Sequence, residues 1–224
     1  MGDTATGPER DFHIEQSEEW VLTTDSSLLK GDPGLATLVL RLGAAVNAIR
    51  AVQRWSVNLK DATGRASERD RIWSFLVAAA YLKEAIDGLL RRHYAEIVRL
   101  AREDGTPEDV ISMLGGLMSK KPHDLYMRLL VNARNNLVFH WEEATFARWV
   151  ENYNGPTLEW AMGAGETDGE IVFSAATIAL LNSLIPGASD SEIRSRVAEV
   201  MEASGLLVGV FQRAIHAFLQ RSPA

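Results

Sequence analysis

The chain has 224 residues, of which 46% are hydrophobic and 24% charged, a composition typical of a folded protein with a sizeable core. It contains no cysteine, which excludes a disulfide scaffold, a cysteine-ligated zinc site and a thiol nucleophile. Its formal net charge of −7 has the wrong sign for coating nucleic acid by bulk electrostatics, so any RNA chemistry must depend on a local basic patch.

Residues 1–26 are polar and acidic, and we interpret them as a flexible or loosely packed arm. Acidic side chains stand where a secretion signal needs a basic region followed by an apolar run. No uninterrupted apolar run approaches the roughly 18 residues that cross a bilayer. We therefore expect a cytoplasmic protein without a membrane partner, with residues 27–224 forming a single domain.

Helical periodicity governs the next part of the chain. Residues 35–59 repeat apolar side chains every three or four positions, with Trp55 on the same face, and Pro33 is well placed to open this helix. Ser67 is a plausible N-cap for a following helix of nearly forty residues. Residues 72–82 of that helix are apolar almost all round, so the pattern predicts that it runs through the centre of a bundle.

Shorter elements follow. Thr106 is predicted to cap a helix over 107–119, and Ser189 and Glu192 have the spacing of a capping box at the start of the last helix. Two short apolar runs around a Gly-rich turn near 157–174 predict the one β-hairpin. The predicted fold class is all-α, a helical bundle with one short β-hairpin insertion.

The common catalytic signatures are absent: the sequence has no Gly-rich phosphate loop, no GxSxG, no HExxH and no two-histidine metal spacing. We therefore expect no cofactor and no metal. What remains is the stretch "ARNNLVFHW", residues 133–141, which places polar residues in an otherwise apolar run. The polar residues of this stretch are Arg134, Asn135, Asn136 and His140.

This stretch resembles the signature of the HEPN domain family, an arginine followed after four to six residues by a histidine, with a polar residue commonly directly after the arginine. Arg134, Asn135 and His140 match that pattern. The preceding long helix, with "YLKEAIDGLL", is also similar, and Glu84 or Asp87 could supply the acidic residue that HEPN helices often place near the pair. The resemblance covers residues 35–150 and implies a HEPN-like bundle.

The resemblance implies a metal-independent endoribonuclease, a toxin or anti-phage defence effector, that cleaves RNA at a homodimer interface and leaves a 2′,3′-cyclic phosphate. The pKa of a histidine side chain is near neutral pH, so His140 would move protons. Arg134 would hold the scissile phosphate. Asn135 would orient the histidine, the phosphate or a base edge. An antitoxin or other partner protein is expected, and DNA is not.

Helix geometry restricts the site. At about 100° per residue, positions six apart lie roughly 120° from each other, so Arg134 and His140 do not share a face of one straight helix. Asn136 and His140 are four apart and do face one another. Either the helix ends between Arg134 and His140, or two protomers bring their copies together across a twofold axis.

Structural interpretations of the same residues remain open. His140 could be a buried histidine bonded by Asn136, and Arg134 could form a salt bridge to Glu84, Asp87 or Glu142. The alternative function is a non-catalytic HEPN-like module for dimerisation, nucleotide binding or partner docking. For RNA, the residues predicted to contact the strand are Lys83, Arg91, Arg92 and Trp141, with His93 beside them.

Overall fold

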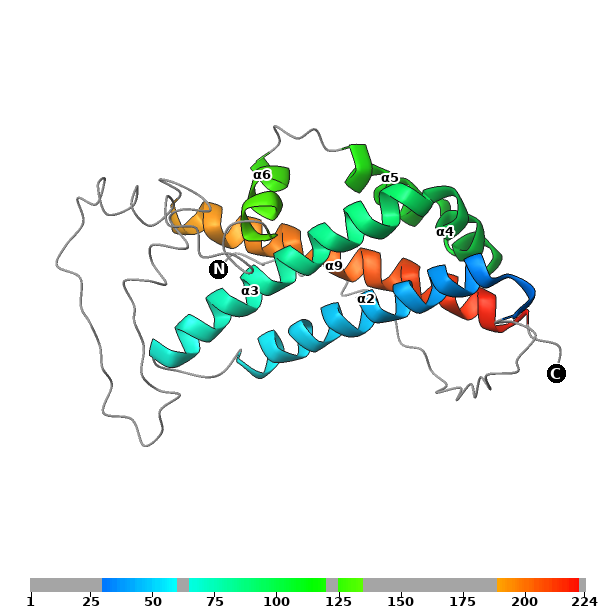
Figure 1. The fold of residues 1–224 in the computed structure, drawn as a ribbon. Coiled ribbons are helices and arrows are strands. Elements are labelled where there is room, and N and C mark those ends of the chain that lie inside the picture. The colour runs from blue at the N-terminus through cyan, green and yellow to red at the C-terminus, as the bar shows by residue number, and fades with distance from the viewer. Residues whose placement is uncertain (1–29, 60–64, 120–124, 135–188, 222–224) are drawn as a thin grey trace, which may run out of the picture.

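The computed structural model describes residues 30–59, 65–119, 125–134 and 189–221, and it is helical over almost all of them, with no strand in these ranges. The predicted all-α class is confirmed for this part of the chain. The N-terminal arm and the hairpin predicted near 157–174 lie outside the described residues, and the HEPN-like arrangement of the bundle stays a prediction. Figure 1 shows the helices and their order.

Helix α2, Pro33–Asn58, begins as the sequence predicts. The Asp32 side chain accepts a hydrogen bond from the Leu35 amide at 2.9 Å, and Pro33 takes the first helical turn, where its missing N–H costs nothing. The apolar positions that follow the predicted periodicity from Leu35 to Val52 are buried. Trp55 is the exception, because it is 38% exposed although it follows the same periodicity.

The predicted forty-residue helix is continuous but not regular. Helix α3, Arg65–Ala85, passes into a π-helical segment, η1, Ile86–Leu90, and then into α4, Arg91–Glu103. Ser67 therefore lies inside α3 and the prediction that it is the N-cap is wrong, since the chain is already helical at Arg65. A second irregularity is His93, whose φ of −127° and ψ of 24° kink the start of α4.

Two shorter helices, α5, Glu108–Ser119, and α6, Leu125–Asn132, follow. Glu108 and Asp109 occupy the first turn of α5, where carboxylates interact favourably with the helix dipole. Thr106 precedes that turn as predicted, but its hydroxyl is buried and makes no hydrogen bond, so it does not cap the helix with its side chain.

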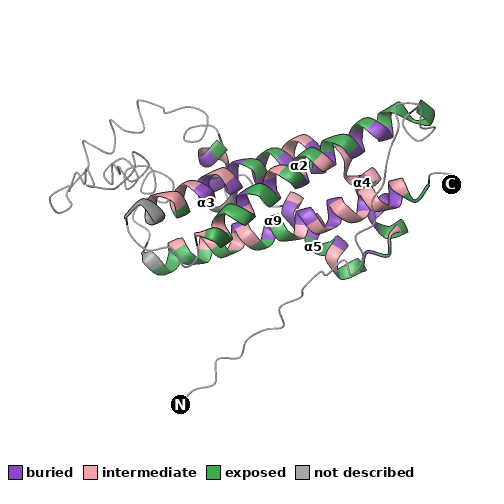
Figure 2. Cartoon of the chain, turned by 90° about the horizontal axis from the view of Figure 1, so that it is seen from below, coloured by how far each residue is buried: buried purple, intermediate pink, exposed green. Residues whose placement is uncertain are grey.

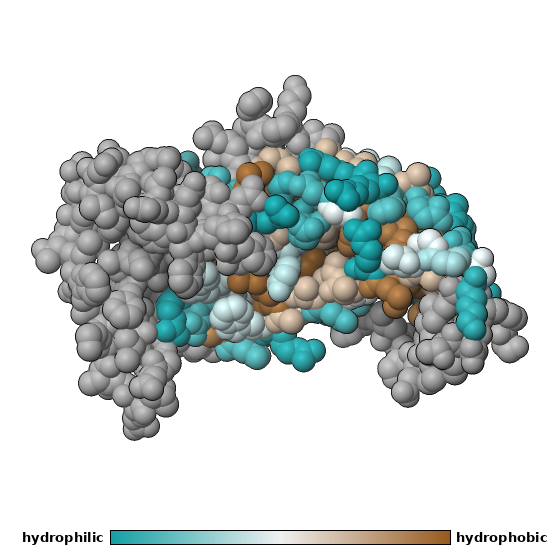
Figure 3. Space-filling model, in the orientation of Figure 1, coloured by the Kyte–Doolittle hydropathy of each residue, from teal (hydrophilic) through white to brown (hydrophobic). Residues whose placement is uncertain are grey.

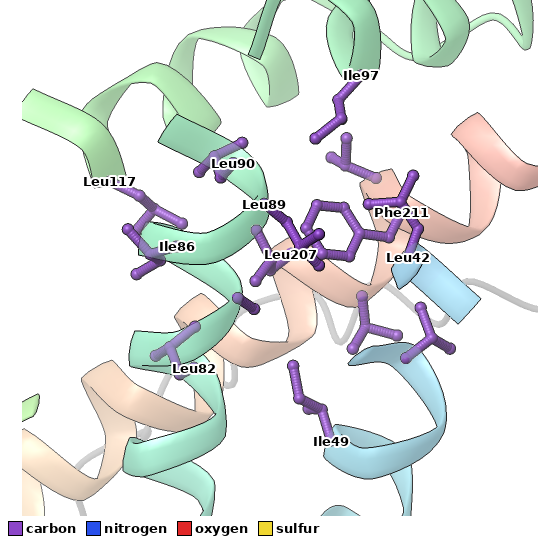
Figure 4. Close-up of a cluster of buried hydrophobic side chains, with 14 of the residues drawn as sticks. Leu42, Ile49, Leu82, Ile86, Leu89, Leu90, Ile97, Leu117, Leu207 and Phe211 are labelled. Carbon is purple, nitrogen blue, oxygen red and sulfur yellow. The ribbon is translucent and has the colours of Figure 1, made fainter. Parts of the chain in front are cut away.

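Helix α9, Asp190–Leu219, joins the bundle together. It contacts α2, α3, α4 and α5, and Figure 1 shows it extending along the length of the helical body. The predicted capping box is present, with the Ser189 and Glu192 side chains each bonded to the other residue's backbone N–H. Phe211 is 0% exposed, and Figure 4 places it among side chains from α2, η1 and α4. Buried residues line the inner sides of the helices (Figure 2).

Helix α2 is the one helix in the described ranges with the length and composition to cross a membrane. The sequence prediction missed it because three arginines interrupt its apolar residues. Eight of its residues are buried in the protein core, which is how a core helix of a soluble protein meets the same criterion.

Candidate functional site

Arg134 lies at the surface, directly after α6. Its Nε and Nη2 atoms each lie 2.9 Å from Oε2 of Glu84 on α3. The two side chains are 45% and 60% exposed, respectively. Of the acidic partners that the sequence offered, Glu84 is therefore the one that α3 presents to Arg134.

Asp87, the other predicted acidic residue, has different partners. It forms ion pairs with Lys83 and, at 2.8 Å, with Arg91, which precede and follow it by one helical turn. Lys83 is only 6% exposed, so its charge is directed to Asp87 and is not displayed at the surface. The prediction that Lys83 binds RNA therefore conflicts with its burial.

Asn135, Asn136, His140 and Trp141 lie outside the described residues. The structure therefore describes the arginine of the motif and its acidic partner, but not the histidine.

Gly88 lies in η1 between these ion pairs, and it is half-buried and contacts groups on both α2 and α3. A Cβ at this position would lie 3.2 Å from Oε1 of Glu84, so the carboxylate extends over the bare glycine. On the other side, Nη2 of Arg41, from α2, donates a hydrogen bond to the Gly88 carbonyl at 3.0 Å. Nη1 of the same guanidinium lies 3.5 Å from Nε2 of His93.

Arg41 was not predicted as a site residue. Its sequence signal is that it is charged within an apolar helix that carries three arginines and no acidic residue. Arg92, which was predicted, is exposed and forms no ion pair with another described residue. Figure 3 shows hydrophilic residues gathered over the part of the molecule where η1 and α4 lie.

The rest of α4 carries cations that are already neutralised. Arg99 contacts Glu96 and Glu103, and Arg102 binds Glu108 through two bonds of 2.7 and 2.8 Å. The hydrogen bond from Arg102 lowers the pKa of Glu108 below its ordinary value. Among the described residues of η1 and α4, the arginine without an ion pair, Arg92, therefore lies next to η1 and not at the far end of α4.

The acidity of the chain is concentrated elsewhere. Residues 1–29 contain seven acidic residues and one basic residue, Arg10, which leaves 23 acidic and 22 basic residues in 30–224. The overall charge of −7 is therefore carried mainly by residues 1–29, and residues 30–224 taken together are close to neutral.

A second polar cluster joins the end of α4 to α9. Nδ1 of His216 lies 2.6 Å from Oδ1 of Asp104, and Arg213 donates to the Asp104 carbonyl at 3.1 Å. The side-chain nitrogen Nε2 of Gln220 lies 3.3 Å from Nε2 of His216. Since both ring nitrogens are engaged, we interpret this cluster as an attachment between helices. The sequence signal for it was the spacing of Arg213, His216 and Gln220 along one side of the last helix.

Within the described ranges no group of three or more His, Asp or Glu side chains could hold a metal ion. No family model, no curated protein and no solved structure that was compared with this chain matches it.

Proposed function

We propose that the protein is a HEPN-like, metal-independent endoribonuclease, a cytoplasmic homodimer that acts as a toxin or anti-phage effector. The observation that supports the proposal most directly is the position of Arg134. It is exposed and oriented by a carboxylate, and the polar stretch that follows it carries the amides and imidazole that such chemistry needs.

In this proposal the 2′-oxygen of a ribose attacks the adjacent phosphorus while the bond from phosphorus to the 5′-oxygen breaks. His140 accepts the proton of the 2′-hydroxyl. A protonated histidine, either the same side chain or His140 of the partner subunit, then donates a proton to the leaving 5′-oxygen. Arg134 stabilises the charge that develops on the phosphate. The products are a 2′,3′-cyclic phosphate and a 5′-hydroxyl.

Glu84 has a positioning role in this scheme. Both side chains of the Glu84–Arg134 pair are exposed, and such exposed ion pairs contribute only about 0–1 kcal/mol to protein stability. A phosphodiester can therefore compete with Glu84 for the guanidinium, while in the unbound protein the carboxylate holds Arg134 in place.

The ion pair also favours a second candidate. If Glu84 satisfies Arg134 permanently, the pair only links α3 to the end of α6, and the protein is a non-catalytic module for dimerisation, nucleotide binding or partner docking.

The test is incubation of purified protein with single-stranded RNA and tRNA in excess EDTA. We expect cleavage that leaves cyclic-phosphate ends and that falls at least about 100-fold in both His140→Ala and Arg134→Ala, the scale of losing a group that stabilises developing charge. Arg134→Lys should keep part of the activity, because lysine supplies charge without two parallel donors. Arg54→Ala, which removes an exposed arginine on α2, is the matched control and should cleave like wild type.

Absence of cleavage by a folded wild-type protein would establish the non-catalytic alternative. Cleavage that persists in both motif variants would place the active site elsewhere.

A further inference from the structure

The surface around Gly88 carries more positive charge than its carboxylates neutralise. The exposed charged residues here are four arginines, Arg41, Arg91, Arg92 and Arg134, and two carboxylates, Glu84 and Asp87, so this surface has a surplus of two positive charges before His93 and the buried Lys83 are counted. The chain as a whole has a charge of −7. A local cationic surface on an otherwise acidic or neutral protein favours binding of an anionic partner.

Arg41 is held in a defined orientation without being neutralised. Its guanidinium contacts a carbonyl oxygen and an imidazole nitrogen, at 3.0 and 3.5 Å, and neither of these groups carries a negative charge. Most other described arginines contact a carboxylate, as Arg91, Arg99 and Arg102 do. Arg41 therefore presents its full charge at a fixed place, which lowers the entropy lost when it binds an anion.

An aromatic ring lies on the same side of the helix. Tyr81, Glu84, Gly88 and Arg92 follow one another at spacings of three, four and four, so they form one row along the continuous helix α3–η1–α4. Tyr81 is 37% exposed, between the buried residues Ala80 and Leu82. Single-stranded nucleic acid is bound by this combination of cations for the backbone and an aromatic ring for a base.

The helix is irregular at this point. The Gly88 carbonyl that Arg41 contacts lies inside the π-helical turn 86–90, and the non-helical dihedral angles of His93 follow shortly after it. Such π-helical turns occur frequently at functional sites, because they displace side chains and backbone groups from the regular helical register.

We propose that Arg41, Arg92 and His93 bind the phosphodiester backbone of single-stranded RNA and that a base stacks on Tyr81. This proposal rests on the proposed function, since it names the surface that would lead the RNA strand to Arg134. A protein partner is the less favoured occupant, because the row combines charge with a single aromatic ring and lacks the apolar core of a protein interface.

The test measures binding separately from cleavage. A fluorescently labelled single-stranded RNA with 2′-O-methyl groups at every position lacks the attacking hydroxyl, so anisotropy reports binding alone. We expect Arg41→Gln and Arg92→Gln each to weaken binding by at least about fivefold and to reduce the slope of log K against log salt by about 0.7, one phosphate contact on a single strand. Tyr81→Ala should weaken binding about 5- to 100-fold, the range for loss of one base stack.

Arg54→Gln is the matched control, because Arg54 is an exposed arginine on α2, about 20 Å along the helix from Arg41 at 1.5 Å per residue. It should bind like wild type, and circular dichroism should show that every variant is folded. Glutamine is chosen for Arg41 because it removes the charge and keeps a polar side chain.

Four results would overturn the proposal: no binding by the wild type, equal losses in Arg54→Gln and Arg41→Gln, equal affinity for a double-stranded RNA, or full competition by polyglutamate with no effect of Tyr81→Ala. The last result would assign the surface to an acidic protein. RNA binding without any cleavage would refute the proposed ribonuclease while sustaining this surface. Cleavage that is unaffected by Arg41→Gln and Arg92→Gln would sustain the proposed ribonuclease and refute this surface.

Discussion

Lys83 combines a long charged side chain with an exposure of only 6%, and its ammonium group is paired with Asp87. The two partners are buried to different degrees, since the Asp87 side chain is 38% exposed and also binds Arg91. The stability of this part of the helix therefore depends on the carboxylate more than on the lysine.

We expect Asp87→Asn to destabilise the protein by about 1–3 kcal/mol, because it leaves the buried ammonium group without its counter-charge. Lys83→Met should be neutral or slightly stabilising, since methionine fills the same space and Asp87 retains Arg91 and water. Urea unfolding checks both values. Glu84→Gln, in an exposed pair, is the control and should change stability by less than about 1 kcal/mol. A larger loss for Lys83→Met than for Asp87→Asn would contradict this assignment.

The same residues show how far the sequence could predict the site. It offered Glu84 and Asp87 as equivalent acidic neighbours of Arg134, because the two lie three residues apart on one helix. The choice between them depends on where α6 packs against α3 and on the i, i+4 partners that Asp87 finds in Lys83 and Arg91. The packing of α6 against α3 does not follow from periodicity, whereas the four-residue spacing of Lys83, Asp87 and Arg91 is a signal in the sequence. Arg41 was missed for a related reason, since its contact with Gly88 joins residues 47 positions apart.

At the scale of the helices, the start of α2 at Pro33 and the Ser189–Glu192 box of α9 were predicted correctly, since both depend only on neighbouring residues. The predicted side-chain caps at Ser67 and Thr106 are absent, so a capping residue type alone does not fix where a helix begins. The π-helical turn 86–90 was not predicted, although Gly88 lies within it. Trp55 has the periodicity of a core residue but is 38% exposed in the last turn of α2.

The capping box gives α9 a pH dependence. Hydrogen bonds from the Ser189 amide and hydroxyl stabilise the carboxylate form of Glu192 and lower its pKa below the ordinary 4.5. A group whose pKa is lower in the folded state stabilises the protein above its unfolded pKa, and this stabilisation is lost as the pH falls through the folded value. Ser189→Ala should cost about 1 kcal/mol at pH 7.

Urea unfolding of wild type and Glu192→Gln at pH 7 and at pH 3 measures the effect. The wild type should be more stable than the variant at pH 7, and the difference should shrink at pH 3. A difference that is the same at both pH values would show that the charge of Glu192 has no part in the cap.

At the scale of the whole molecule, one continuous core joins the described helices, and Phe211 of α9 lies inside it. The side chain is 0% exposed and is among the largest that are fully buried. We expect Phe211→Ala to lower the free energy of unfolding by about 3–5 kcal/mol, from lost transfer energy and the cavity that remains. Leu40→Ala, at a position that is 65% exposed, should change it by less than about 0.5 kcal/mol. Equal effects of the two substitutions would be incompatible with a central position for α9.

The central position of α9 also has a consequence for synthesis of the protein on the ribosome. The helices that α9 covers, α2 to α5, are all translated before residues 190–219. Since domains form their cores only when the covering segments are available, the nascent chain carries uncovered apolar helix faces until α9 has left the exit tunnel. The nascent chain therefore exposes the most apolar surface for a chaperone to bind after α5 and before α9 has been translated.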